Sequence, residues 1–246
     1  MIRRMLILGA TGDLTLRYLL PALARLREAD KLPEGFAVSG LARDDWDTES
    51  FRAFAEENLA EHTPDLSAKA RREFVEVLDY HRADVTDPGR IEAPLKDSGE
   101  PVVAYLALPP TVFAPTIEAL NIADLPEGSR VVIEKPFGED LRSARELNRL
   151  LRDSFPEEAV FRVDHFLGLQ TVQNVLGLRF ANRVFEPLWN HDHIERVEIV
   201  WDETLALEGR AGYYDEAGGA EGRDPEPPPA TTVPGRHGAA HDPPRA

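Results

Sequence analysis

Two short motifs carry ionisable side chains that could act in catalysis or bind a ligand. RVDHFLG places Asp164 beside His165, and EKPFG places Lys135 directly after Glu134. A carboxylate beside an imidazole can take part in proton transfer. A lysine at a strand end is costly to bury unless it forms an ion pair or binds a hydroxyl or phosphate. Asp164 and His165 can serve one ligand only if the chain turns there, because neighbouring strand residues point to opposite faces. A hydrogen-bonded corner and a Glu134–Lys135 ion pair are the alternative interpretations.

A third motif, GATGDL, joins an apolar run to an amphipathic stretch. Gly9 and Gly12 permit a tight turn, and the free N–H groups of the helix that follows can face a pyrophosphate. The motif lacks the full G-x-G-x-x-G spacing, so an ordinary strand-to-helix turn remains the alternative. Its position after the first apolar run favours a dinucleotide-binding turn.

Two further strand ends are candidates for cofactor contact. Arg43 stands where an NAD-preferring site usually has an acidic residue for the ribose hydroxyl, so a cation there suits the 2′-phosphate of NADP. The alternative is a solvated surface arginine. In YLALPP a double proline forces the chain out of the sheet, so Leu108 and Pro109 are placed to touch a cofactor. The alternative is a rigid turn that binds no ligand.

Predicted strands and helices alternate along the chain around these motifs. Short apolar runs bounded by turn signals predict strands at 5–10, 36–43, 77–85, 102–110, 130–137 and 160–166. Helical spacing of apolar residues predicts helices at 14–29, 50–62, 111–120 and 143–155. We therefore predict the α/β class, with a Rossmann-like, doubly wound parallel sheet.

A second domain begins after these elements. We expect a helix over 169–185 and a half-buried strand over 194–205. From Gly219 onward the chain has no Leu, Ile, Phe, Met, Trp or Tyr and is rich in Pro, Gly and Ala, so it has nothing to bury. We predict three regions: a dinucleotide-binding domain over 1–175, the start of an incomplete α+β domain over 176–218, and a disordered tail over 219–246. The abrupt change near Gly218 suggests a truncation or a reading-frame shift.

Composition excludes several classes. The 28 Lys and Arg against 44 Asp and Glu give a net charge of -16, which argues against nucleic acid or anionic membranes as partners. The absence of cysteine excludes disulfides and thiolate sites, and we expect His191 and His193 to lie in a solvated loop, so no metal site is predicted. No apolar run is long enough to span a membrane or form a signal peptide, so we expect a cytoplasmic location.

Taken in order, the motifs resemble the glucose-6-phosphate dehydrogenase family. GATGDL, the strand-end arginine, YLALPP, EKPFG, RVDHFLG, LRFANRVFEPLWN and GRAGYYDEAG follow the family's order over about 3–218. The resemblance implies NADP-dependent oxidation of the C1 hydroxyl of glucose 6-phosphate, or a related sugar, to the lactone, the first step of the oxidative pentose phosphate pathway. It also implies a homo-oligomer.

The resemblance also implies roles for single residues. It places Thr11, Asp13 and Leu14 against the cofactor phosphates and Arg43 on the 2′-phosphate. Lys135 would bridge cofactor and sugar, and His165 and Glu203 would contact the substrate. Asp164 would orient and charge-stabilise a catalytic histidine that takes the proton from the C1 hydroxyl.

The chain departs from the family pattern at several positions. Leu169 and Tyr18 stand where lysines are usual, which predicts weaker phosphate binding or a different sugar. The Q-N-H motif of the general base is absent, so we expect this chain to turn over slowly or not at all. A non-catalytic NADP-binding module, or a partner of a full-length paralogue, is the alternative function. Among enzymes, the sugar dehydrogenases with a nucleotide fold and an E-K-P motif come second, whereas short-chain dehydrogenases fail because no Tyr-x-x-x-Lys is present.

Overall fold

The computed structural model describes residues 1–92, 94–95, 99–138, 140–198, 200 and 233–234. It divides into two compact units, Met1–Val163 and Asp164–Ala246, which are described separately below.

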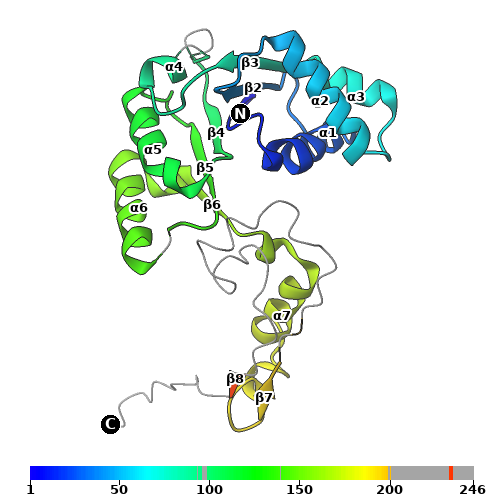
Figure 1. The fold of residues 1–246 in the computed structure, drawn as a ribbon. Coiled ribbons are helices and arrows are strands. Elements are labelled where there is room, and N and C mark those ends of the chain that lie inside the picture. Colours follow the sequence, from blue (N-terminus) through cyan, green and yellow to red (C-terminus); the bar gives the residue numbers. More distant parts are fainter. Residues whose placement is uncertain (93, 96–98, 139, 199, 201–232, 235–246) are drawn as a thin grey trace. The chain divides into compact units, whose positions relative to one another are not determined.

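The first unit is built on a parallel sheet of six strands in the order β3-β2-β1-β4-β5-β6 (Figure 1). The strands are β1 Arg4–Leu8, β2 Ala37–Ala42, β3 Leu78–Arg82, β4 Val102–Leu106, β5 Arg130–Glu134 and β6 Val160–Val163. This is the doubly wound Rossmann order, and the direction of winding reverses between β1 and β4. All six predicted strands are present, and each ends earlier than predicted because the chain leaves the sheet where the candidate functional loops begin.

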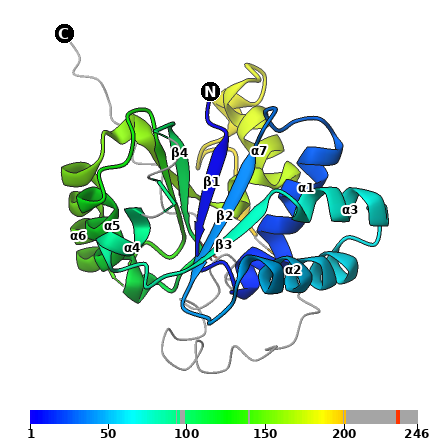
Figure 2. The ribbon, with the colours of Figure 1, turned by 90° about the horizontal axis from the view of Figure 1, so that it is seen from above.

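Helices cover both faces of the sheet. In Figure 2, α1, α2 and α3 lie on one side and α4, α5 and α6 on the other. The helices of this unit are α1 Leu20–Glu28, α2 Thr48–His62, α3 Ala68–Val75, α4 Pro88–Glu92, α5 Phe113–Ile122 and α6 Leu141–Ser154, and the 3-10 turns are η2 Pro110–Val112 and η3 Glu157–Ala159. Helices α3 and α4 were not predicted from the sequence.

The two faces of the sheet carry two separate hydrophobic cores. Met5 and Ile7 pack into the core beneath α1 and α2, whereas Leu6 and Leu8 pack into the core beneath α5 and α6. β1 is therefore buried on both sides, which explains why it reads as an unbroken apolar run.

The first helix starts with a π-helical turn, η1 Thr15–Leu19. Leu20 N–H donates to the carbonyl of Thr15, five residues back. Pro21 follows inside α1, where it has no N–H to donate and its ring would crowd the carbonyl of Arg17. The wider π turn accommodates the proline.

The second unit begins with a short turn and a helix. It contains η4 His165–Gly168, α7 Gln170–Phe180 and η5 Glu186–Leu188, and β7 Arg196–Val197 pairs antiparallel with β8 Val233–Pro234. The predicted helix 169–185 is corrected to α7, and the predicted strand 194–205 is described only as β7. Apart from β8, the predicted disordered tail lies outside the described residues, and the predicted domain boundaries stay predictions.

Candidate functional site

The carboxyl ends of the strands bring four of the candidate loops to one edge of the sheet. Gly9 follows β1, Arg43 follows β2, Ala107 follows β4 and Lys135 follows β5. Ligands of open α/β sheets bind at this edge, next to the point where the winding reverses. The geometry of the edge therefore decides whether these residues fit a dinucleotide.

Gly9 is held between the loops on either side of it. Its N–H donates to the carbonyl of Leu41 at 2.8 Å, and its φ is 94°, which favours glycine. A Cβ at this position would lie 2.1 Å from the carbonyl oxygen of Ala107 and 3.1 Å from Cδ2 of Leu108. The structure thus brings together Gly9 and Leu108, two of the predicted cofactor contacts.

The turn after Gly9 leads directly into helical conformation. Gly12 N–H and the Thr15 hydroxyl both donate to the carbonyl of Gly9, at 3.1 and 3.0 Å. Asp13 is exposed, and Leu14 already has helical φ and ψ. The N–H groups of a first helical turn lack acceptors within the helix, so this turn can receive a pyrophosphate.

The loop after β2 carries a carboxylate that the sequence analysis missed. The Thr11 hydroxyl donates to Oδ2 of Asp44 at 2.7 Å, which ties this loop to the glycine turn. Arg43 is exposed, and its charge adds to the hydrogen bonds from Thr86 in lowering the pKa of Asp84. An acidic residue shortly after the second strand was the sequence signal that could have pointed to Asp44.

A buried tyrosine holds the same loop from below. The hydroxyl of Tyr80 donates to the main-chain carbonyl of Asp44 at 2.9 Å. Burial, together with the negative charges of Asp44 and Asp45, raises the pKa of Tyr80 to about 12. The phenol therefore stays protonated, and it keeps donating to the loop throughout the physiological range.

The motif around Lys135 begins with a buried carboxylate. Glu134 ends β5, is buried, and accepts a hydrogen bond from the hydroxyl of Tyr105 on the neighbouring strand β4. Burial first, and then the contact with Glu134, raise the pKa of Tyr105 above its usual range. Lys135 stands one residue past the strand, is half-buried, and precedes a cis peptide bond to Pro136. Glu134 thus anchors the segment that carries Lys135.

The chain turns at the Asp-His pair, as its joint use would require. β6 ends at Val163, so the predicted strand 160–166 is corrected there. Oδ1 of Asp164 accepts from the N–H of Phe166 at 3.0 Å and caps η4, which begins at His165. His165 is exposed. Within the second unit, Asp164 is therefore a capping residue as well as a catalytic candidate.

The structure places the candidate residues Tyr18 and Leu169 but does not describe Glu203. Tyr18 is 61% exposed on the π turn and Leu169 is 39% exposed after η4, so both could be reached by a ligand. Glu203 lies outside the described residues, and its predicted substrate contact stays a prediction.

Nδ1 of His193 lies 3.0 Å from Oδ1 of Asn190, and no group of three or more potential metal ligands occurs among the described residues. None of the helices in the described part of the chain is long and apolar enough to cross a membrane.

The strand order and the constrained glycine turn define a Rossmann-like dinucleotide-binding protein. The family model "Glucose-6-phosphate dehydrogenase, NAD binding domain" matches residues 6–174, and the C-terminal domain model of the same family matches 176–222. The chain belongs to the glucose-6-phosphate dehydrogenase family, whose N-terminal domain indicates a nicotinamide dinucleotide cofactor.

Individual relatives agree with the family assignment. Glucose-6-phosphate 1-dehydrogenase 2 of Mycobacterium tuberculosis is 43% identical over 231 residues, which cover 88% of this chain and 45% of the relative. The crystal structure of glucose-6-phosphate 1-dehydrogenase from Mycobacterium avium has a TM-score of 0.79 at 35% identity, covering 90% of this chain and 49% of that one. A glucose-6-phosphate dehydrogenase in complex with its substrate glucose-6-phosphate has a TM-score of 0.75 at 30% identity, covering 89% and 48%. The chain thus spans about half the length of the relatives it matches.

Proposed function

We propose that this chain is the dinucleotide-binding part of an NADP-dependent glucose-6-phosphate dehydrogenase. The proposed reaction oxidises the C1 hydroxyl of glucose 6-phosphate, or of a related sugar, to the lactone. The observation that carries the proposal is the family match over residues 6–174, since those residues form a Rossmann sheet whose glycine turn has no room for a side chain at Gly9. We propose further that the whole protein is a cytoplasmic homo-oligomer.

The cofactor would lie across the carboxyl edge of the first unit. The turn from Gly9 through Thr11 to Leu14, with Gly12 and Asp13 inside it, would receive the pyrophosphate through its free N–H groups. The guanidinium of Arg43 would pair with the 2′-phosphate, and Leu108 and Pro109 would contact the dinucleotide after β4. When bound, the cofactor supplies the acceptor for a hydride from the sugar C1.

The proposed substrate contacts are those that the family resemblance implies. The ammonium of Lys135 would hold a sugar hydroxyl beside the cofactor, and His165 would contact the sugar phosphate, with Glu203 as a further contact. The carboxylate of Asp164 would hold a histidine in one tautomer and stabilise its charge when that histidine takes the C1 proton. Leu169 and Tyr18 supply no charge to the phosphate, which makes a sugar other than glucose 6-phosphate the alternative substrate.

A chimera tests this proposal. Residues 1–174 of this chain are joined to the C-terminal domain of the Mycobacterium tuberculosis relative, and NADPH formation from glucose 6-phosphate is followed by absorbance. We expect the chimera to form NADPH, and Lys135→Ala to lower kcat/KM by about 100-fold or more, as for the loss of a charged contact to the reacting substrate. Lys69→Ala, an exposed lysine on α3, is the matched control and should change nothing.

Two outcomes would contradict the proposal. A folded chimera that binds NADP but forms no NADPH would favour a non-catalytic NADP-binding module. Equal effects of Lys135→Ala and Lys69→Ala would remove Lys135 from the substrate site.

A further inference from the structure

The loop after β2 carries opposite charges in two consecutive residues, Arg43 and Asp44. Asp44 is fixed at two points: its side chain accepts from Thr11 at 2.7 Å, and its main-chain carbonyl accepts from Tyr80 at 2.9 Å. Asp45 is held differently, because its carboxylate pairs with Arg82 on β3 at 2.6 Å. Of the two carboxylates, only that of Asp44 is tied to the turn that would bind the cofactor.

The position of Asp44 matters because of what binds there in this fold. The end of the second strand of a Rossmann sheet receives the adenosine ribose, and a carboxylate at that point accepts a hydrogen bond from the ribose 2′-hydroxyl. A 2′-phosphate cannot donate in the same way, and its negative charge is repelled by a carboxylate within a few ångströms. The formal net charge of -16 on the chain adds to this repulsion.

Arg43 acts in the opposite sense. Its guanidinium is exposed and attracts a 2′-phosphate, but its charge also acts on Asp84 at the end of β3. The Thr11 hydrogen bond keeps the Asp44 carboxylate at the glycine turn. One residue of the loop thus favours the phosphate and the next favours the hydroxyl.

We propose that Asp44 makes this site accept NAD as well as NADP, by accepting the ribose 2′-hydroxyl of NAD and by opposing the 2′-phosphate of NADP. The inference rests on the proposed cofactor site, and it names the residue that decides between the two cofactors.

Calorimetric titrations of the chain with NAD and with NADP provide the test. For the unaltered chain we expect dissociation constants that differ by less than about tenfold. Asp44→Asn should tighten NADP by about tenfold, because a like charge is removed, and should weaken NAD several-fold, because a neutral amide is a poorer acceptor. Asparagine can still accept from Thr11, so the loop should keep its conformation; thermal melting checks this.

Asp45→Asn is the matched control. It removes the same charge one residue away, from a carboxylate that pairs with Arg82 and not with the glycine turn. It should shift both dissociation constants by less than about twofold, as screened surface charges do. Arg43→Ala should weaken NADP and leave NAD nearly unchanged. An unaltered chain that prefers NADP by more than about 100-fold, or an NAD-to-NADP ratio that responds equally to Asp44→Asn and Asp45→Asn, would overturn the inference alone. Failure of the folded chain to bind either cofactor would overturn the proposed function as well.

Discussion

A Cβ atom on Gly9 would lie 2.1 Å from the carbonyl oxygen of Ala107, so the loops after β1 and β4 touch through a glycine that no other residue can replace without movement. These two strands flank the point where the winding of the sheet reverses. The contact therefore fixes the shape of the edge at which the dinucleotide is proposed to bind.

Gly9→Ala should strongly destabilise the first unit. The substitution combines a backbone clash with a φ of 94°, and the two effects together should cost about 2–4 kcal/mol. Gly12→Ala is the control, because a Cβ there meets only the Gly9 carbonyl, at 3.4 Å, and the cost should stay below about 1 kcal/mol. Urea unfolding followed by circular dichroism measures both. Equal losses would mean that the Gly9 contact is not a constraint.

Tyr105→Phe should destabilise the chain because it removes a donor from the buried carboxylate of Glu134. The expected loss is about 1–3 kcal/mol, the usual cost of leaving a buried polar group short of a partner. Tyr18→Phe, at an exposed tyrosine, should change the free energy of unfolding by less than about 0.5 kcal/mol. If Tyr105→Phe proves as harmless as Tyr18→Phe, the hydrogen bond does not contribute to stability.

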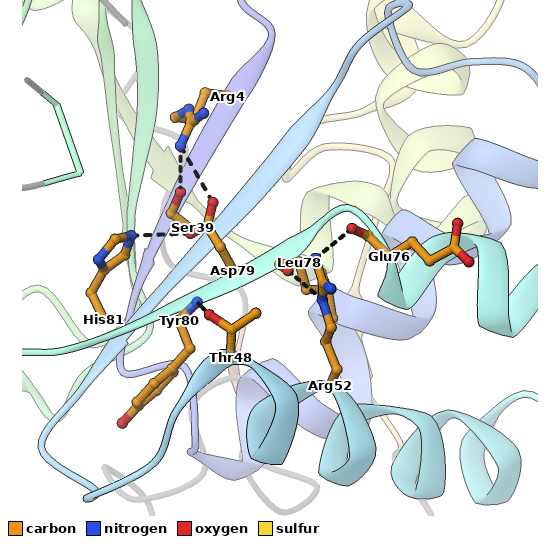
Figure 3. Close-up of polar contacts among 9 residues, drawn as sticks. All are labelled: Arg4, Ser39, Thr48, Arg52, Glu76, Leu78, Asp79, Tyr80 and His81. Atoms are coloured by element: carbon orange, nitrogen blue, oxygen red, sulfur yellow. Dashed lines mark hydrogen bonds and ion pairs between the residues drawn. The ribbon is translucent and has the colours of Figure 1, made fainter. Parts of the chain in front are cut away.

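The acid stability of the first unit should depend on Asp79. Figure 3 shows its carboxylate between Arg4 and His81: Arg4 Nη1 lies 3.4 Å from Oδ2, and His81 Nε2 lies 3.2 Å from Oδ1. Burial opposes ionisation, but the neighbouring His81 and Ser39 side chains and the positive charge of Arg4 together lower the pKa of Asp79.

A lowered pKa in the folded state means that ionised Asp79 stabilises the fold above its unfolded pKa of about 3.9, and that this stability is lost as the pH falls through the folded value. Asp79→Asn should therefore cost about 1 kcal/mol at pH 7, and the difference from the unaltered chain should shrink below about pH 4. Unfolding free energies measured from pH 7 down to pH 3 test this. A difference that stays constant across the range would assign the loss to packing alone.

Leu169→Lys should strengthen the binding of glucose 6-phosphate in the chimera. One added charged hydrogen bond to a phosphate is worth about 1.5–3 kcal/mol, which corresponds to a KM about 10- to 100-fold lower. Leu167→Lys, two residues earlier and also exposed, controls for the added charge. If glucose 6-phosphate gains nothing while another sugar phosphate is oxidised well, the protein uses a different substrate.

Asp164→Asn separates capping from catalysis. Asparagine can still accept from the N–H of Phe166, so η4 should remain, but its neutral side chain cannot stabilise a charged histidine. We expect kcat of the chimera to fall by about 100-fold or more with little change in the dissociation constant of NADP. An unchanged kcat would leave Asp164 with the structural role only.

Strand β1 could be predicted from the sequence because a parallel strand buried on both faces reads as a continuous apolar run. Helix α3 could not, since only Phe74 and Val75 of its residues are buried and its other positions are alanine, lysine, arginine and glutamate, which mark no apolar face. Asp44 was missed for a different reason: its partner Thr11 is 33 positions away, so the contact exists only after β1 and β2 have paired. The turn after Asp164 was predicted only conditionally: the chain has to turn there if Asp164 and His165 are to serve one ligand.

Amide chemical shifts of the 15N-labelled chain during a titration with NADP locate the dinucleotide site. If the carboxyl edge of the sheet is the dinucleotide site, the largest shifts will fall on residues 9–14, Arg43 and Leu108. The amide signal of Gly128, which precedes β5 at the opposite edge, will not shift. Saturating shifts confined to the Gly128 edge, or no shifts in a folded chain at millimolar NADP, would show that the dinucleotide does not bind at the carboxyl edge.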